Sequence, residues 1–168
     1  MRRLTLITLT AFLASAAVAD AAVYDIPRVL RADLGKVAKR TDVPIRLPTR
    51  MSLDYGDAVF GSGRGAKKEY ELEVAATDPC GANACFLARF AGEEGGAPSF
   101  KRTVSLANGI TGHYKPLSCG GSCSPPMIEW VQGGVLYSIQ AKLGVSGRKR
   151  QRRAMVRAAN SAIRSTPR

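Results

Sequence analysis

The sequence predicts an α+β fold: one antiparallel meander sheet of about six strands, with an N-terminal and a C-terminal helix packed on one face. Apolar residues recur at helical spacing from residue 26 to residue 37, and again from residue 155 to residue 163. Between these segments apolar and polar residues alternate, which is the period of a strand buried on one face. A sheet with helices on one side buries the apolar surfaces of both elements together.

The first 21 residues have the features of a signal peptide. Arg2 and Arg3 give a short positive start, and residues 4–18 carry no charge. Small residues then form two A-x-A sequences, so we expect cleavage after Ala19 or Ala21. The apolar stretch is shorter than the ~20 residues that span a bilayer, and no cysteine follows it that could carry a lipid anchor. A buried N-terminal helix is the alternative.

Cleavage leaves residues 22–168, a length that fits one soluble domain, secreted or periplasmic. Asp25 marks a helix start, and the segment 41–44 ends that helix. Residues 45–47 lie between two prolines and fit a short edge strand. The glycine-rich stretch within 55–68 fits a flexible loop.

From residue 69 the hydrophobic period changes to two. The apolar members of the successive strands are Tyr70, Leu72, Val74 and Ala76; Phe86, Ala88 and Phe90; Val104 and Leu106; Ile110, Gly112 and Tyr114; Ile128 and Trp130; and Val135, Tyr137, Ile139, Ala141 and Leu143. Asn108-Gly109 separates two of these strands and is typical of a type I′ hairpin turn. The pattern predicts antiparallel strands that share one apolar face.

A final helix is predicted from about residue 148 to residue 164. Its apolar stripe consists of Met155, Val156, Ala159 and Ile163. A helix with one apolar stripe buries that stripe, so we expect it to pack on the apolar face of the sheet.

Four cysteines lie in the mature chain: Cys80, Cys85, Cys119 and Cys123. An even number in an exported chain predicts two disulfides. Loop closure alone favours cross-pairing, because it contributes roughly 4 kcal/mol for a forty-residue loop and roughly 2 kcal/mol for a five-residue loop. The connectivity therefore depends on where the strands place the cysteines.

In a simple meander, the Cys80–Cys85 loop and the Cys119–Cys123 loop lie at opposite ends of the sheet. Strands of the expected length hold those ends about 17–20 Å apart, and a disulfide needs Cα atoms within roughly 7 Å. We therefore expect the local pairs, although a crossover connection would reverse the placement of the loops. The same separation argues against a four-cysteine zinc site, so we expect no metal.

Residues that could carry catalysis are scarce. His113 is the only histidine, and the alternation places it on the solvent face of its strand without a positioned partner. Glu69, Glu71 and Glu73 line the wet face of one strand. No G-x-S-x-G elbow occurs, and the disulfides leave no thiol for a Cys–His pair. We expect neither an enzyme nor a cofactor.

The net charge of +12 is concentrated near the C-terminus. The cluster that opens the last helix consists of Arg148, Lys149, Arg150, Arg152 and Arg153. Each cation at a helix N-terminus interacts unfavourably with the helix dipole, at a cost of about 0.3–1 kcal/mol. An anionic partner would offset that cost. An acidic lipid or an anionic cell-wall polymer fits an exported protein. Nucleic acid does not, because the export signal conflicts with it. A solvated, solubilising face is the alternative.

Several segments resemble a group of small exported bacterial proteins of unknown function. They are Cys80–Phe86, Asn108–Gly112, Cys119–Pro126, Ile128–Trp130 and Ala159–Ile163. From Cys119 onward the residues follow the order CGxSC…W…GG…Y…ANSAI. The closing hairpin and last helix are also similar to a domain of unknown function on bacterial membrane-anchored regulators. The resemblance covers about residues 72–163. It implies export and this fold, and it names no activity.

The leading hypothesis is a non-catalytic extracytoplasmic binding or structural module whose basic last helix contacts an anionic envelope surface. The alternative is a carrier or sensor that binds a small apolar ligand between the sheet and the helices. An enzyme would need a convergent pocket that contains His113 and a carboxylate.

Overall fold

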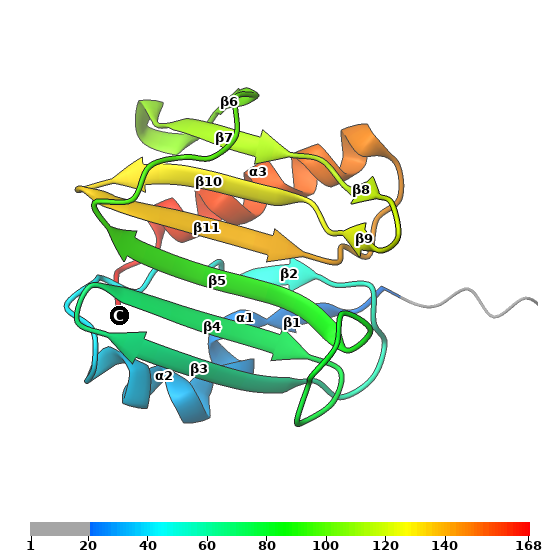
Figure 1. Ribbon diagram of the computed structural model, residues 1–168, viewed down its shortest axis with the longest axis horizontal. Coiled ribbons are helices and arrows are strands. Elements are labelled where there is room, and N and C mark those ends of the chain that lie inside the picture. Colours follow the sequence, from blue (N-terminus) through cyan, green and yellow to red (C-terminus); the bar gives the residue numbers. More distant parts are fainter. Residues whose placement is uncertain (1–20) are drawn as a thin grey trace, which may run out of the picture.

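The computed structural model describes residues 21–168, and the first 20 residues of the predicted signal peptide lie outside this range. The described chain is α+β, as predicted. One seven-stranded antiparallel sheet carries its helices on one face (Figure 1). Among residues 21–168, none of the helices combines the length and the apolar character that crossing a membrane requires.

The N-terminal segment packs on the face of the sheet that carries the helices. Its elements are β1 (Val23–Asp25), α1 (Ile26–Val29), α2 (Arg31–Ala38) and β2 (Arg50–Ser52), and β1 pairs with β2. The Asp25 carboxylate accepts a hydrogen bond from the backbone N–H of Arg28 at 3.0 Å and so caps α1, as the sequence predicts. Residues 45–47 form no strand. Instead, Ile45 exchanges two backbone hydrogen bonds with Arg168.

The order of the strands in the main sheet differs from their order in the chain. Across the sheet they are β3 (Phe60–Ala66), β4 (Glu69–Ala75), β5 (Phe86–Glu94), β11 (Val135–Ala141), β10 (Met127–Gln132), β7 (Thr111–Lys115) and β6 (Thr103–Ser105). A separate hairpin is formed by β8 (Ser118–Cys119) and β9 (Cys123–Ser124). The last helix, α3 (Arg148–Arg164), has the predicted bounds.

The predicted flexible loop at Gly61–Gly65 is in fact the regular edge strand β3. Its alternate glycines face α1 and α2. A Cβ at Gly61 would lie 2.8 Å from the Val29 carbonyl oxygen of α1, and a Cβ at Gly63 would lie 2.9 Å from Val37 Cγ2 of α2. Only glycine lets the helices approach the strand so closely, so the run is a packing surface and not a mobile tip.

The Asn108-Gly109 turn has the predicted geometry. Asn108 (φ 57°) and Gly109 (φ 72°) both adopt the left-handed conformation, as a type I′ turn requires. Ile110 N–H donates to the Ala107 carbonyl at 3.2 Å and closes the turn. The turn joins β6 to β7 as neighbours.

The meander is broken between β5 and β6. The strand beside β5 is β11, which pairs with it at seven positions, whereas β6 has only three residues to offer. Residues 95–102 therefore cross to the far edge of the sheet over the face that carries no helix (Figure 1). This crossing segment, called the strap below, is held by Ser99 N–H, which donates to Glu129 Oε2 at 2.7 Å. His113 Nδ1 donates to the Phe100 carbonyl oxygen at 2.6 Å.

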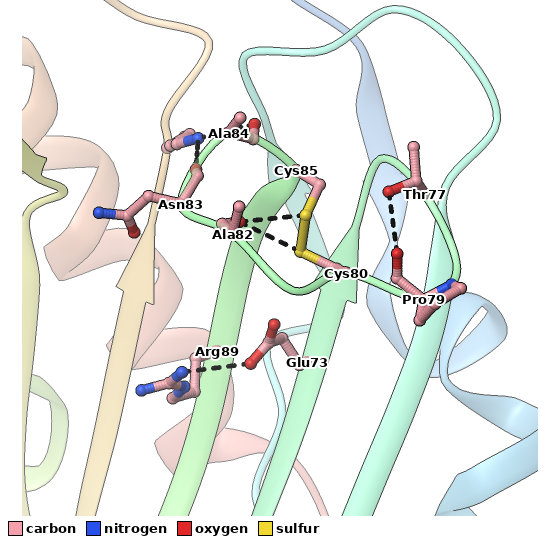
Figure 2. The surroundings of a disulfide bond; sticks show 10 residues. Glu73, Thr77, Pro79, Cys80, Ala82, Asn83, Ala84, Cys85 and Arg89 are labelled. Carbon is pink, nitrogen blue, oxygen red and sulfur yellow. Dashed lines mark hydrogen bonds and ion pairs between the residues drawn. A yellow bond between two sulfur atoms is a disulfide. The ribbon is translucent and has the colours of Figure 1, made fainter.

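The broken meander changes where the disulfides lie. Four successive antiparallel pairings separate β4 from β7, so these strands run the same way and both cysteine loops lie at one end of the sheet. The expectation of opposite ends is wrong for this reason. The bonds are nevertheless the expected local ones, Cys80–Cys85 (Figure 2) and Cys119–Cys123. Two disulfides indicate an oxidising, extracytoplasmic environment.

The end of β11 contacts both disulfide loops. Lys142 Nζ donates to the carbonyl oxygens of Asn83 and of Ala84, the latter at 3.1 Å. Gln140 Nε2 lies 3.5 Å from Ser124 Oγ on the other side. Hydrogen bonds therefore fix each loop to the central strand, in addition to its own disulfide.

The core lies between the sheet and the helices. It contains one row of paired residues across the sheet, Leu72, Phe90, Ile139, Ile128 and Tyr114. Next to it, the rings of Trp130 and Tyr137 stack with centroids 5.5 Å apart. Tyr137 OH donates to the Pro44 carbonyl oxygen at 3.0 Å, which ties the N-terminal segment to the sheet.

Candidate anion-binding surface

Helix α3 places the basic cluster because its opposite side is anchored in the core. The buried residues of the helix are Met155, Ala158, Ala159, Ala162 and Ile163. Small alanines let the helix lie close to β10 and β11. Arg46 Nη1 donates to the carbonyl oxygens of Ile163 (3.0 Å) and Ser165 (3.2 Å), which satisfies free acceptors at the helix C-terminus.

The predicted anion-binding residues all lie exposed in the first turns of α3. They are Arg148, Lys149, Arg150, Arg152 and Arg153. The helix begins after Gly147 (φ 85°) with no side-chain cap and no acidic residue in its first turn. Arg150 Nε donates back to the Ser146 carbonyl oxygen at 2.9 Å. The other four cations form no such bond within residues 21–168.

A groove runs between this part of α3 and strand β6. Its volume is about 680 Å³. It is lined by Val104, Ser105, Lys149, Arg152, Arg153, Val156 and Arg157. Two valines thus provide apolar contact surface among four cationic side chains. We call these seven residues the basic groove.

Carboxylates do not neutralise the basic groove in the described part of the chain. From residue 95 to the C-terminus the sequence has twelve Lys and Arg residues and a single acid, Glu129. Glu129 is buried beneath the strap on the opposite face of the sheet. The ion pairs of residues 21–168 involve other cations: Lys36, Arg64, Lys68 and Arg89. Because the groove is concave and of one sign, it concentrates positive potential.

Two further cations join this surface, although the sequence pattern did not mark them as binding residues. Lys101 and Arg102 are exposed at the end of the strap, directly before β6. The sequence pattern that could have indicated them is a Lys-Arg pair directly before a predicted strand. Only the crossing of the strap brings the pair to the edge beside α3, so a meander could not have placed it there.

The pKa of Tyr114 is affected by cations beside the groove. Its side chain is 2 % exposed, and its hydroxyl has no hydrogen-bond partner among the described residues. Burial raises the pKa of Tyr114, while the positive charges of Arg102 and Arg152 act in the opposite direction. The positive charge of the strap and that of α3 therefore both reach Tyr114.

His113 lies on the predicted face of its strand, but the strap covers that face. Directly opposite it on β10 is Glu129, which is buried. The two side chains share the strap as their hydrogen-bond partner, through Phe100 and Ser99. Both groups thus hold a structural segment. In residues 21–168, no three His, Cys, Asp or Glu side chains gather as a metal site would require.

The alternative of a carrier needs space for an apolar ligand between the sheet and the helices. Large side chains fill it, and Trp130, Tyr137, Phe90 and Met155 are among the residues that are fully buried there. The grooves beside α3 are open and lined partly by arginine, as at Arg157 and Arg164. The basic groove is therefore the feature with the most defined ligand chemistry: it can hold carboxylate or phosphate groups.

No family model, no curated protein and no solved structure matches this chain.

Proposed function

We propose that this protein is a non-catalytic binding module of the bacterial cell envelope, which docks on an anionic surface through helix α3. The observation that carries the proposal is the basic groove with its neighbouring cations, none of which has a carboxylate partner among residues 21–168. Leaving so many like charges together costs free energy unless a partner neutralises them. Phosphate or carboxylate groups on acidic lipids or on a cell-wall polymer would do so.

Export supports the same proposal. Residues 1–21 have the sequence features of a signal peptide, and the two disulfides fit an oxidising compartment. An exported cationic protein meets anionic phospholipid headgroups and cell-wall polymers before it meets nucleic acid. The signal peptide, its removal after Ala19 or Ala21 and the secreted or periplasmic location are parts of this proposal.

The test is retention of the oxidised mature protein on vesicles that mix an anionic with a neutral phospholipid, and separately on immobilised polyphosphate. Neutralising Arg148, Lys149, Arg150, Arg152 and Arg153 to glutamine should lower retention at least about tenfold, since each cation near an anionic surface contributes about 1 kcal/mol. Added salt should weaken retention of the unmodified protein.

The matched control removes as many charges elsewhere. Arg28, Arg31, Lys36, Lys39 and Arg40 lie exposed on and after α1 and α2, so replacing them with glutamine gives a variant of equal net charge. That variant should be retained almost as well as the unmodified protein. Equal losses in the two variants would show that only net charge matters, and they would contradict a docking site on α3.

A further inference from the structure

Strand β6 has a free edge. Tyr114 N–H donates to the Arg102 carbonyl oxygen at 2.8 Å, and Leu106 N–H donates to that of Ile110 at 2.9 Å. Backbone groups alternate between the two sides of a strand. The N–H and C=O groups of Thr103 and Ser105 therefore point away from β7, and no strand covers them within residues 21–168. The edge offers two hydrogen-bond donors and two acceptors.

The free edge lies beside the basic groove, because Val104 and Ser105 belong to both. The three residues of β6 span about 10 Å. On α3, the row from Lys149 through Arg152 to Val156 also spans about 10 Å at 1.5 Å per residue. The two segments have matching lengths, and Val104 and Ser105 line the same groove as Lys149 and Arg152. A chain added along β6 would therefore lie beside these cations.

We propose that β6 binds an extended acidic peptide segment as an additional strand, with alternate acidic side chains facing Lys149 and Arg152. The proposal rests on the proposed function for the sign of the partner's charge, and it names the class of partner. Main-chain hydrogen bonds to Thr103 and Ser105 would give affinity, and the cations of α3 would select acidic sequences.

The geometry favours a peptide over the other occupants. A lipid headgroup can neutralise cations but cannot pair with alternating donors and acceptors along a strand edge. A second copy of this chain would bring the same cations to the same place, and like charges repel. An extended acidic peptide satisfies the backbone groups and the charges together.

The experiment measures binding of a fluorescent peptide in which glutamate alternates with valine, compared with one in which lysine replaces glutamate. The key variant is Ser105→Pro, which removes an outward N–H and leaves the β6–β7 hydrogen bonds and every cation in place. Ser105→Ala is its matched control, because it keeps that N–H. Arg152→Glu is a second variant that changes only an exposed side chain.

We expect the glutamate peptide to bind and the lysine peptide not to bind. Ser105→Pro and Arg152→Glu should each weaken binding about tenfold, as expected for the loss of a buried hydrogen bond or a desolvated ion pair. Ser105→Ala should bind within about twofold of the unmodified protein, since it loses only the hydroxyl. Far-ultraviolet circular dichroism shows whether Ser105→Pro has kept the fold; if it has not, Thr103→Pro takes its place.

Other outcomes separate this proposal from the proposed function. If Ser105→Pro and Thr103→Pro both bind the glutamate peptide normally while Arg152→Glu does not, the contact is purely ionic and strand addition is wrong. If neither peptide binds but anionic vesicles retain the protein, the peptide proposal fails alone. If the peptide, the vesicles and the immobilised polyphosphate all fail to bind the protein, the proposed function fails together with the peptide proposal.

Discussion

At the scale of single residues, the glycines of β3 show how a side chain that is absent can determine packing. Gly63 faces Leu72 and Val37, which are both fully buried. A Cβ here would force both neighbours to shift within a close-packed interior. The helix pair α1–α2 can therefore lie against β3 only if this position has no Cβ.

We predict that Gly63→Ala destabilises the protein by about 1–3 kcal/mol, the usual cost of overpacking a core. The measurement is urea unfolding of the oxidised protein. Gly35→Ala is the control, because beyond the adjoining residues and backbone of α2 nothing lies within 4 Å of its Cβ position. Alanine in a helix should stabilise the protein by about 0.5–1 kcal/mol. Equal stability of Gly63→Ala and the unmodified protein would mean that Leu72 and Val37 do not pack tightly against this position.

At the scale of elements, the strap decides the topology and brings Lys101 and Arg102 to the basic surface. Glu129 helps to hold the strap, because its buried carboxylate accepts the hydrogen bond from Ser99 N–H. A backbone N–H that loses its partner in a buried place costs about 1–3 kcal/mol. The strap is thus held by one carboxylate and one imidazole, beside only a few backbone bonds.

We predict that Glu129→Ala speeds amide hydrogen exchange at Ser99 at least about fivefold, which corresponds to about 1 kcal/mol of lost protection. Ser138→Ala is the matched control, since Ser138 lies opposite Glu129 on β11 and on the same face. It should leave exchange at Ser99 unchanged. Unchanged exchange in Glu129→Ala would show that the strap is held by other contacts.

The elements could be predicted from the sequence where the pattern is local. The segments with a hydrophobic period of two form strands, and Asn108-Gly109 forms a type I′ turn. Helix α3 and the cap at Asp25 follow the same rule. These features depend on residues within a few positions of each other, which is the range over which propensity and periodicity act.

The features that the sequence missed depend on long-range pairing. Nothing local shows that β11 and not β6 lies beside β5, because both have suitable alternation. A glycine run reads as a loop until a helix packs against it, as at Gly63. The local disulfide pairs were predicted correctly, although the loops lie at the same end and not at opposite ends.

On the scale of the whole molecule, the parts of the chain before and after residue 95 differ in the balance of acidic and basic residues. The part before residue 95 pairs Glu71 and Glu73 with Arg64 and Arg89 on the open face of the sheet. The part after it has one acid, and that acid is buried. The strand order brings Lys101 and Arg102, directly before β6, to the edge where Lys149, Arg152, Arg153 and Arg157 of α3 line the basic groove. The sequence predicted the cluster on α3, but the groove required the fold.

The most direct test of this account is a titration of the oxidised mature protein with soluble polyphosphate, followed by the backbone amide signals in two-dimensional NMR. The account predicts saturable shifts that centre on residues 148–157 and 101–105 and that weaken as salt is added. Shifts that centre instead on α1–α2 or on the disulfide loops, or that fail to saturate, would contradict it.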